Sequence, residues 1–125
     1  MIVATDAPLI PIQCKRLAQR VTVGLARAGG VGHNGSGDIF LAFSTGNHPS
    51  QDSSNDAGLD SGHPVDVQMI PNHHIDPLFE ATAEAVEESI LNALTSAETT
   101  TGYRGRTAHA IPLDTLQRVM ERYRP

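Results

Sequence analysis

The order of apolar and polar positions in the first third of the chain predicts a strand, a helix and a second strand. The run from Met1 to Thr5 is short and apolar and ends at an Asp and a Pro, as strands often do. From Pro11 to Ala28, apolar residues recur four apart, which predicts an amphipathic helix with one buried face (Leu17, Val21 and Leu25). The nearly continuous apolar run from Ile39 to Phe43 predicts a buried strand.

Two loops and a third strand are expected next to these elements. A glycine-rich loop, Gly29 to Gly37, joins the first helix to the second strand. The stretch from Gly46 to Gly62 is rich in Ser, Asn, Asp and Gly and has no periodicity, so we expect a surface loop. Alternating residues from Val65 to Ile70 predict a strand with one solvated face.

The second half of the chain predicts two helices. The longer one runs from about Ile75 to Ala97, with Asp76 as its N-cap and one apolar face (Phe79, Val86, Ile90 and Leu94). A turn or loop is expected from Thr99 to Gly105, and a short amphipathic helix from Leu113 to Tyr123. This order of strands and helices indicates an α/β layered fold, with no internal repeat and no domain boundary.

Composition excludes several classes of function. The net charge is −5 and no Lys/Arg cluster is present, so we expect no nucleic-acid partner. The single cysteine, Cys14, allows neither an internal disulfide nor a cysteine-type zinc site, and it falls near apolar helix positions, where a small core residue is expected. No apolar run approaches the roughly 20 residues that cross a bilayer, and no signal peptide precedes the first strand, so a cytoplasmic protein is expected. The six histidines lack a metal-ligand spacing, and we expect neither a metal nor a cofactor.

The segment from His33 to Ile39 carries the candidate chemistry. Ser36 stands between two glycines just ahead of the second predicted strand. Because Gly35 has no side chain, its carbonyl is open to attack by the Ser36 hydroxyl, and unusual backbone angles cost little there. Breaking the Gly35–Ser36 bond would free an α-amine, whose pKa of about 7.7–8.0 suits a base acting on the same serine. On the local pattern alone, an ordinary turn explains the same residues.

Four blocks in the same order resemble the DmpA-type L-aminopeptidase/D-Ala-esterase/amidases and the β-peptidyl aminopeptidases. The blocks are Ile2–Leu9, the helix with Arg16-Leu17-Ala18 and Gly24-Leu25-Ala26-Arg27, Asn34–Thr45, and Glu87–Leu94 followed by Thr99–Gly102. The resemblance implies an αββα sandwich of the N-terminal-nucleophile type and a precursor that cleaves itself before Ser36. Residues 1–35 would then be the tail of the large subunit and residues 36–125 the small subunit, together a single partial domain. Part of the oxyanion hole and the pocket for the substrate's amino group would come from a large-subunit segment that is missing here.

The resemblance also names partners for the serine. Glu87 matches the family's glutamate on the late helix, whereas Ala85 stands where the family has a serine. Thr82, one turn earlier, could present a hydroxyl to a similar region, and Asn34 could line the site. Asp38 is expected to be a hydrogen-bonding residue of the loop or strand end and not a catalytic acid.

Two functional hypotheses remain open at this stage. The first is a self-processing serine aminopeptidase or amidase that releases N-terminal residues from short peptides, amides or esters, with little activity expected from this chain alone. The second is a catalytically inactive α/β association module that keeps the fold, which Ala85 favours. Either way, an uncovered apolar sheet face would favour a homo-oligomer. The related self-cleaving acetyltransferases use threonine as nucleophile, so Ser36 counts against them.

Overall fold

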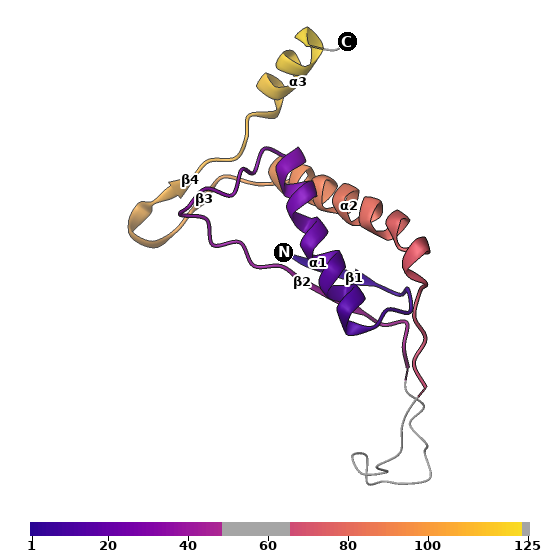
Figure 1. Cartoon of the computed structure of the whole chain (residues 1–125). Helices are drawn as coiled ribbons and strands as arrows, with labels where there is room; N and C mark the ends of the chain where they lie inside the picture. The colour runs from indigo at the N-terminus through magenta and orange to yellow at the C-terminus, as the bar shows by residue number, and fades with distance from the viewer. Residues whose placement is uncertain (49–65, 124–125) are drawn as a thin grey trace.

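The computed structural model describes residues 1–48 and 66–123. Strand β1 is followed by helix α1, strand β2, helix α2, a small hairpin and a last helix (Figure 1). The bounds are β1 Ile2–Thr5, α1 Pro11–Arg27, β2 Leu41–Ser44, α2 Asp76–Thr95, β3 Thr100–Thr101, β4 Thr107–Ala108 and α3 Leu113–Arg122. The α/β class is therefore confirmed.

Strands β1 and β2 form a parallel pair connected through α1. The register aligns Ile2 with Leu41 and Ala4 with Phe43. Because strand side chains alternate between faces, these four share one face of the sheet, and the next residues along each strand share the other. The second face contributes Val3 and Ala42 to the core, which lies beneath the two long helices.

The other face of this sheet is bare, which corrects the prediction of a buried strand from Ile39 to Phe43. The strand itself begins at Leu41, and Ile2, Leu41 and Phe43 are 69%, 54% and 45% exposed. The nearly continuous apolar run from Ile39 to Phe43 is typical of a strand that is covered on both faces. Only one covering layer, the helices, is present among the described residues, so the sheet resembles one half of a two-sheet sandwich.

Helices α1 and α2 pack closely against each other over that sheet. Leu17 and Val21 of α1 and Val86 of α2 are almost fully buried. Gly24 makes the close approach possible, because a Cβ built on it would lie 2.4 Å from the Ala83 carbonyl oxygen. The predicted α1 and α2 are therefore confirmed, with ends within two residues of the expected positions.

The prediction of a strand from Val65 to Ile70 is wrong for its described part, residues 66–70, which form no ladder. Side chains hold this segment instead. The Asn47 side chain accepts from the Gln68 amide at 2.8 Å and donates to the Gln68 carbonyl at 3.0 Å, as a neighbouring strand would. The buried Gln13 side chain donates to the Ile70 carbonyl. Most of the loop predicted from Gly46 to Gly62 lies outside the described residues.

Two details at the ends of α2 also differ from the prediction. Ile75 is the N-cap and Asp76 the first helical residue, because the Ile75 side chain is fully buried in the core and the helix begins directly after it. The expected loop from Thr99 to Gly105 contains β3 of the antiparallel β3–β4 hairpin. Helix α3 is confirmed and stands away from the rest of the molecule (Figure 1).

Candidate active site

The loop between α1 and β2 carries the candidate nucleophile. Gly29, with φ of 95°, ends α1 in the left-handed conformation that favours glycine there. The chain then runs without regular structure to a turn in which the Ser36 amide donates to the His33 carbonyl at 2.7 Å. Asn34 and Gly35 are the exposed central residues of this turn.

The Ser36 hydroxyl donates a hydrogen bond to the Asp38 carboxylate, and both residues are exposed. A carboxylate in contact with a serine hydroxyl can accept its proton when the oxygen attacks. The expectation that Asp38 forms hydrogen bonds is confirmed, but its direct contact with Ser36 was missed. This contact makes Asp38 a candidate for proton transfer, a role that was not expected from the sequence. The two-residue spacing was the only sequence signal for it.

Gly35 does not adopt the backbone angles that only glycine tolerates. Positive φ values occur in this loop at Gly29 and Gly32 but not at Gly35, so the conformation shows no strain of that kind before Ser36. A Cβ on Gly35 would meet no heavy atom within 4 Å. The peptide bond that enters Ser36 is therefore open to approach.

Glu87 lies on α2 and faces the end of α1. One of its carboxylate oxygens is 3.8 Å from Arg27 Nη1, and both side chains are partly exposed. Arg27 is the last residue of α1, so this ion pair lies where the loop to Ser36 begins. No hydrogen bond joins Glu87 to Ser36 in this structure; the hydroxyl contacts Asp38 instead.

Thr82 and Ala85, which precede Glu87 on α2, differ in exposure. Thr82 is buried between the helices, and its hydroxyl donates to the Leu78 carbonyl at 2.7 Å. That hydroxyl is satisfied within its own helix. Ala85, which the resemblance matched to a serine of the family, is exposed and has no hydroxyl to offer.

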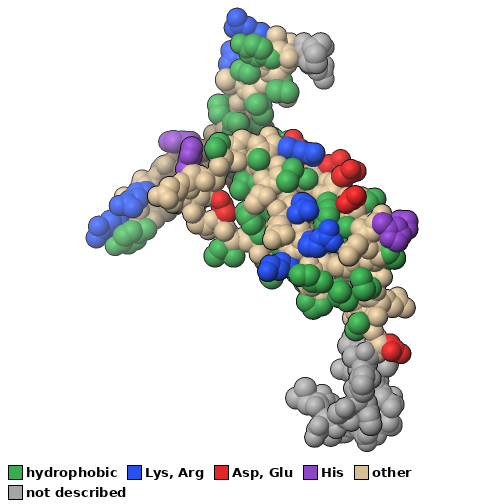
Figure 2. All heavy atoms as spheres, in the orientation of Figure 1, with side chains coloured by type: hydrophobic (Ala, Val, Ile, Leu, Met, Phe, Trp, Pro, Cys, Tyr) green, Lys and Arg blue, Asp and Glu red, His purple; other side chains and the backbone are tan. Residues whose placement is uncertain are grey.

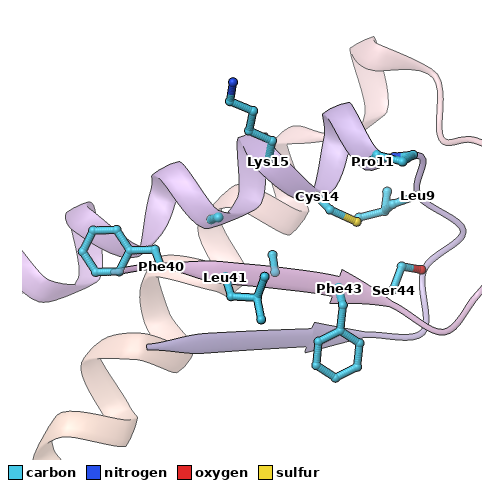
Figure 3. A pocket seen from close by; sticks show the side chains of 10 residues that line it. Leu9, Pro11, Cys14, Lys15, Phe40, Leu41, Phe43 and Ser44 are labelled. Atoms are coloured by element: carbon cyan, nitrogen blue, oxygen red, sulfur yellow. The ribbon is translucent and has the colours of Figure 1, made fainter. Parts of the chain in front are cut away.

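A pocket of about 500 Å³ lies between α1 and β2 (Figure 3). Leu9 and Cys14 point into the space between the two elements, while Lys15 points away from it. The residues that line the pocket come from α1, from β2 and from positions next to these elements, and they include neither Ser36 nor Glu87. The pocket is therefore separate from the candidate nucleophile. Cys14 packs against the core cluster, as expected for a small core residue.

Charged side chains are arranged in two rows over the helices (Figure 2). On α1, the guanidinium carbons of Arg16 and Arg20 lie 5.0 and 4.2 Å from the centre of the Phe79 ring of α2. Arg16 also donates to the Asn72 side chain at 3.0 Å. These cation–π contacts stabilise the packing of α1 against α2 at the surface of the molecule.

The histidines of the described part form no cluster with other side chains that could bind a metal ion. His73 and His74 lie in a short helical turn with ring centres 4.2 Å apart, and no three His, Cys, Asp or Glu side chains among residues 1–48 and 66–123 could hold a metal ion. None of the helices in these ranges is long and apolar enough to cross a membrane.

Comparisons with known proteins agree with the arrangement of these elements. The family model of peptidase family S58 matches residues 1–108. A β-peptidyl aminopeptidase BapA of Sphingosinicella microcystinivorans is 42% identical over 124 residues, which is 99% of this chain and 30% of that protein. A second one, from Sphingosinicella xenopeptidilytica, is 34% identical over 97% of this chain and 29% of that protein. The chain thus spans about 30% of the length of the curated relatives that it matches.

Solved structures show the same likeness. The PH0078 protein of Pyrococcus horikoshii OT3 superposes with a TM-score of 0.84 at 44% identity, covering 99% of this chain and 33% of that chain. The L-aminopeptidase D-Ala-esterase/amidase of Ochrobactrum anthropi, described as a variant of the Ntn hydrolase fold, gives 0.78 at 38% identity, covering 98% of this chain and 33% of that chain. The described elements are thus part of such a layered sandwich, and the resemblance to the DmpA-type enzymes is confirmed. By its family model and its relatives, this chain belongs to peptidase family S58.

Proposed function

We propose that this chain is part of a self-processing serine aminopeptidase or amidase, with Ser36 as its nucleophile. The observation that carries the proposal is the exposed Ser36 hydroxyl, hydrogen-bonded to Asp38 and preceded by an unobstructed glycine peptide. Family membership supports the reaction class, since the relatives are aminopeptidases. The proposed substrates are short peptides, amides or esters with a free N-terminus.

The proposed maturation step uses atoms that already lie close together. Ser36 Oγ attacks the Gly35 carbonyl carbon while its proton passes to the Asp38 carboxylate. The C–N bond then breaks, the proton passes from Asp38 to the departing Ser36 nitrogen, and an ester joins Gly35 to Ser36 Oγ. Water hydrolyses this ester, which leaves a carboxylate on Gly35 and a free α-amine on Ser36. That amine then serves as the base for the same hydroxyl in later turnovers.

We assign Glu87 the role of a second catalytic carboxylate, on the strength of the family resemblance. Its ion pair with Arg27 lies at the end of α1 from which the Ser36 loop begins, which supports this assignment. A carboxylate beside the new α-amine would accept a hydrogen bond from it and so orient it. Asn34 is proposed to line the site, and Thr82 receives no chemical role because its hydroxyl is bonded within α2.

The rest of the site is proposed to come from a large-subunit segment. An acyl transfer needs donors placed where negative charge develops, and within the described residues no hydrogen bond is donated to the Gly35 carbonyl. The bare sheet face of Ile2, Leu41 and Phe43 is apolar and suits a second sheet packed against it. We therefore expect little or no peptidase turnover by this chain alone. Self-cleavage is still expected, because the Ser36 hydroxyl attacks the adjoining peptide bond of its own backbone and needs no substrate pocket.

Mass spectrometry of the purified chain tests this function. The expected product is a fragment that begins at Ser36, which should accumulate in the wild-type chain and be absent from Ser36→Ala. The matched variant Ser44→Ala removes a serine hydroxyl of β2 that bonds to the Ala7 carbonyl, so it should still cleave. A wild-type chain that stays intact for as long as Ser36→Ala does would refute self-processing.

A second candidate function, an association module without catalysis, is favoured by Ala85 and by the bare sheet face. Such a module would use the apolar face to form a homo-oligomer or to hold another polypeptide. In that case both the wild type and Ser36→Ala would remain uncleaved after incubation, and both would have the same oligomeric state.

A further inference from the structure

The turn before Ser36 contains an asparagine followed by a glycine, Asn34-Gly35, and no other asparagine of the sequence precedes a glycine. In such a pair the glycine nitrogen can attack the side-chain amide carbon of the asparagine and close a succinimide ring. A side chain on the second residue hinders this approach, and glycine has none. The pair therefore places a nucleophile next to an electrophile without any part played by the Ser36 hydroxyl.

The structure leaves both reacting groups of this pair free. Asn34 and Gly35 are exposed, and within the described residues neither the Asn34 side chain nor the Gly35 N–H forms a hydrogen bond. A Cβ on Gly35 would meet no heavy atom within 4 Å, so no neighbour obstructs the approach. The turn is closed by the bond from the Ser36 amide to the His33 carbonyl, and one exposed hydrogen bond contributes little to stability. Rotation at Asn34 into the geometry of ring closure therefore meets little resistance.

The other asparagines of the described part are held in place. The Asn47 side chain accepts from the Gln68 amide at 2.8 Å and donates to its carbonyl at 3.0 Å. The Asn72 side-chain oxygen accepts from Arg16 at 3.0 Å. Asn92 lies inside α2, where regular helical hydrogen bonds engage the N–H of the following residue. Ring closure is therefore expected to be much slower at these three positions.

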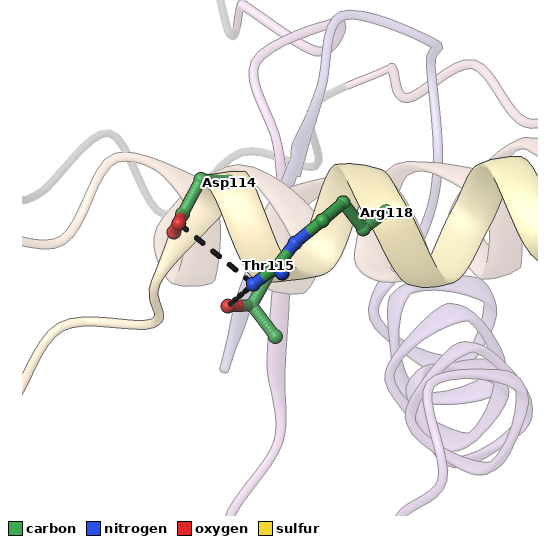
Figure 4. Close-up of polar contacts among 3 residues, drawn as sticks. All are labelled: Asp114, Thr115 and Arg118. Carbon is green, nitrogen blue, oxygen red and sulfur yellow. Dashed lines mark hydrogen bonds and ion pairs between the residues drawn. The ribbon is translucent and has the colours of Figure 1, made fainter.

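Asp114 on α3 is an exposed side chain at which the same ring closure is hindered. It is 80% exposed, and its carboxylate lies 4.0 Å from Arg118 Nη2 (Figure 4). The next residue, Thr115, is β-branched, and its amide donates to the Pro112 carbonyl at 3.1 Å. The nitrogen that would attack is thus shielded and hydrogen-bonded at Asp114, whereas at Asn34 it is neither.

We propose that Asn34 is a site of spontaneous deamidation, at which a succinimide and then an isoaspartate form two residues before Ser36. The Gly35 nitrogen attacks Asn34 Cγ, the Cγ–Nδ2 bond breaks, and the proton of the Gly35 N–H leaves with the side-chain nitrogen as ammonia. Water then opens the ring, at the side-chain carbonyl to give aspartate or at the backbone carbonyl to give isoaspartate. Water is the only co-reactant.

Isoaspartate at position 34 would alter the turn that self-cleavage uses, and this consequence rests on the proposed function. The main chain would then pass through the former side-chain carbons, which inserts an extra methylene between His33 and Gly35. The longer link separates the His33 carbonyl from the Ser36 amide and displaces the Gly35 carbonyl from the Ser36 hydroxyl. Attack is sensitive to displacements of about 1 Å. Deamidation and self-cleavage are therefore competing fates of the same turn.

Peptide mapping of the Ser36→Ala chain tests the modification without relying on self-cleavage. In mildly alkaline buffer, the peptide with Asn34 should gain the mass difference between a carboxyl and an amide group, and an isoaspartyl methyltransferase should label it. The double variant Gly35→Ala, Ser36→Ala should react at least ~10-fold more slowly, because the new Cβ hinders the attacking nitrogen. If Asn34 reacts no faster than Asn92, or if the double variant keeps pace with Ser36→Ala, the proposal is wrong.

The wild-type chain tests the competition. The yield of the fragment that begins at Ser36 should stop short of completion, and it should rise when the methyltransferase and its methyl donor are added, because they return isoaspartate to aspartate. An unchanged yield, or complete cleavage without the methyltransferase, would overturn the competition and leave the modification standing. A wild-type chain that never cleaves would refute self-processing and the competition with it, whereas the Ser36→Ala map still decides the modification.

Discussion

Replacing Gly24 with alanine tests whether the close approach of α1 and α2 stabilises the fold. The new Cβ would lie 2.4 Å from the Ala83 carbonyl oxygen and 2.6 Å from Val86 Cβ, where ordinary contacts begin at 3.4 Å. The helices would have to separate by about 1 Å, the difference between 3.4 and 2.4 Å. Because the nearest atom belongs to the backbone, no side-chain rotation relieves this contact.

Two effects of opposite sign compete in this substitution. Alanine in a helix interior is favoured over glycine by about 1 kcal/mol. Overpacking a tight interface costs about 1–3 kcal/mol, and a clash with backbone belongs at the upper end of that range. The free energy of unfolding should therefore fall by about 2 kcal/mol.

Urea unfolding followed by circular dichroism measures the change. With a denaturant slope of about 2 kcal/mol/M, the midpoint should fall by about 1 M. Gly37→Ala is the matched control, because a Cβ there meets nothing within 4 Å and its φ is not positive. Its midpoint should be unchanged or slightly raised. If Gly24→Ala unfolds at the wild-type midpoint or above it, the close packing inferred for the two helices is wrong.

Three further substitutions test other parts of the structure. Gln13→Ala removes the buried donor to the Ile70 carbonyl and should lower the free energy of unfolding by about 1–3 kcal/mol in the same urea assay; an unchanged value would contradict the contact. Asn47→Ala removes the side chain that brackets Gln68 and should speed hydrogen exchange of the Gln68 amide, with Asn92→Ala as an exposed control. Asp38→Asn keeps an acceptor for Ser36 but cannot take its proton, so self-cleavage should slow about 100-fold by mass spectrometry; a wild-type rate would exclude Asp38 as the base.

Regular helices were predictable from the sequence because their periodicity records their buried faces. Leu17 and Val21 mark the face of α1, and Val86 that of α2, and all three are buried as the spacing indicates. Leu94, which the spacing assigns to the same face of α2, is 50% exposed. The exposure of one face of β2 was not predictable from the sequence. Its apolar residues match a layer that the described part does not contain, so Leu41 and Phe43 remain exposed.

Errors outside the helices came from interactions between distant residues. The segment from residue 66 to 70 alternates like a strand, but the Asn47 side chain occupies the place of a neighbouring strand. In the candidate site, Ser36 stood out only through the family resemblance, since its local pattern also describes a turn. The Asp38 contact depends on how the loop folds, which periodicity does not record.

The position of the Gly35–Ser36 bond within the β1–α1–β2 crossover has a consequence for any nicked molecule. Residues before the bond supply β1 and α1, while residues after it supply β2 and α2. The parallel ladder and the packing of the two long helices both connect the two pieces across the nick. A nicked chain would thus run as two bands on a denaturing gel yet migrate as one species on a native gel, with backbone hydrogen bonds and apolar contacts replacing the broken covalent link.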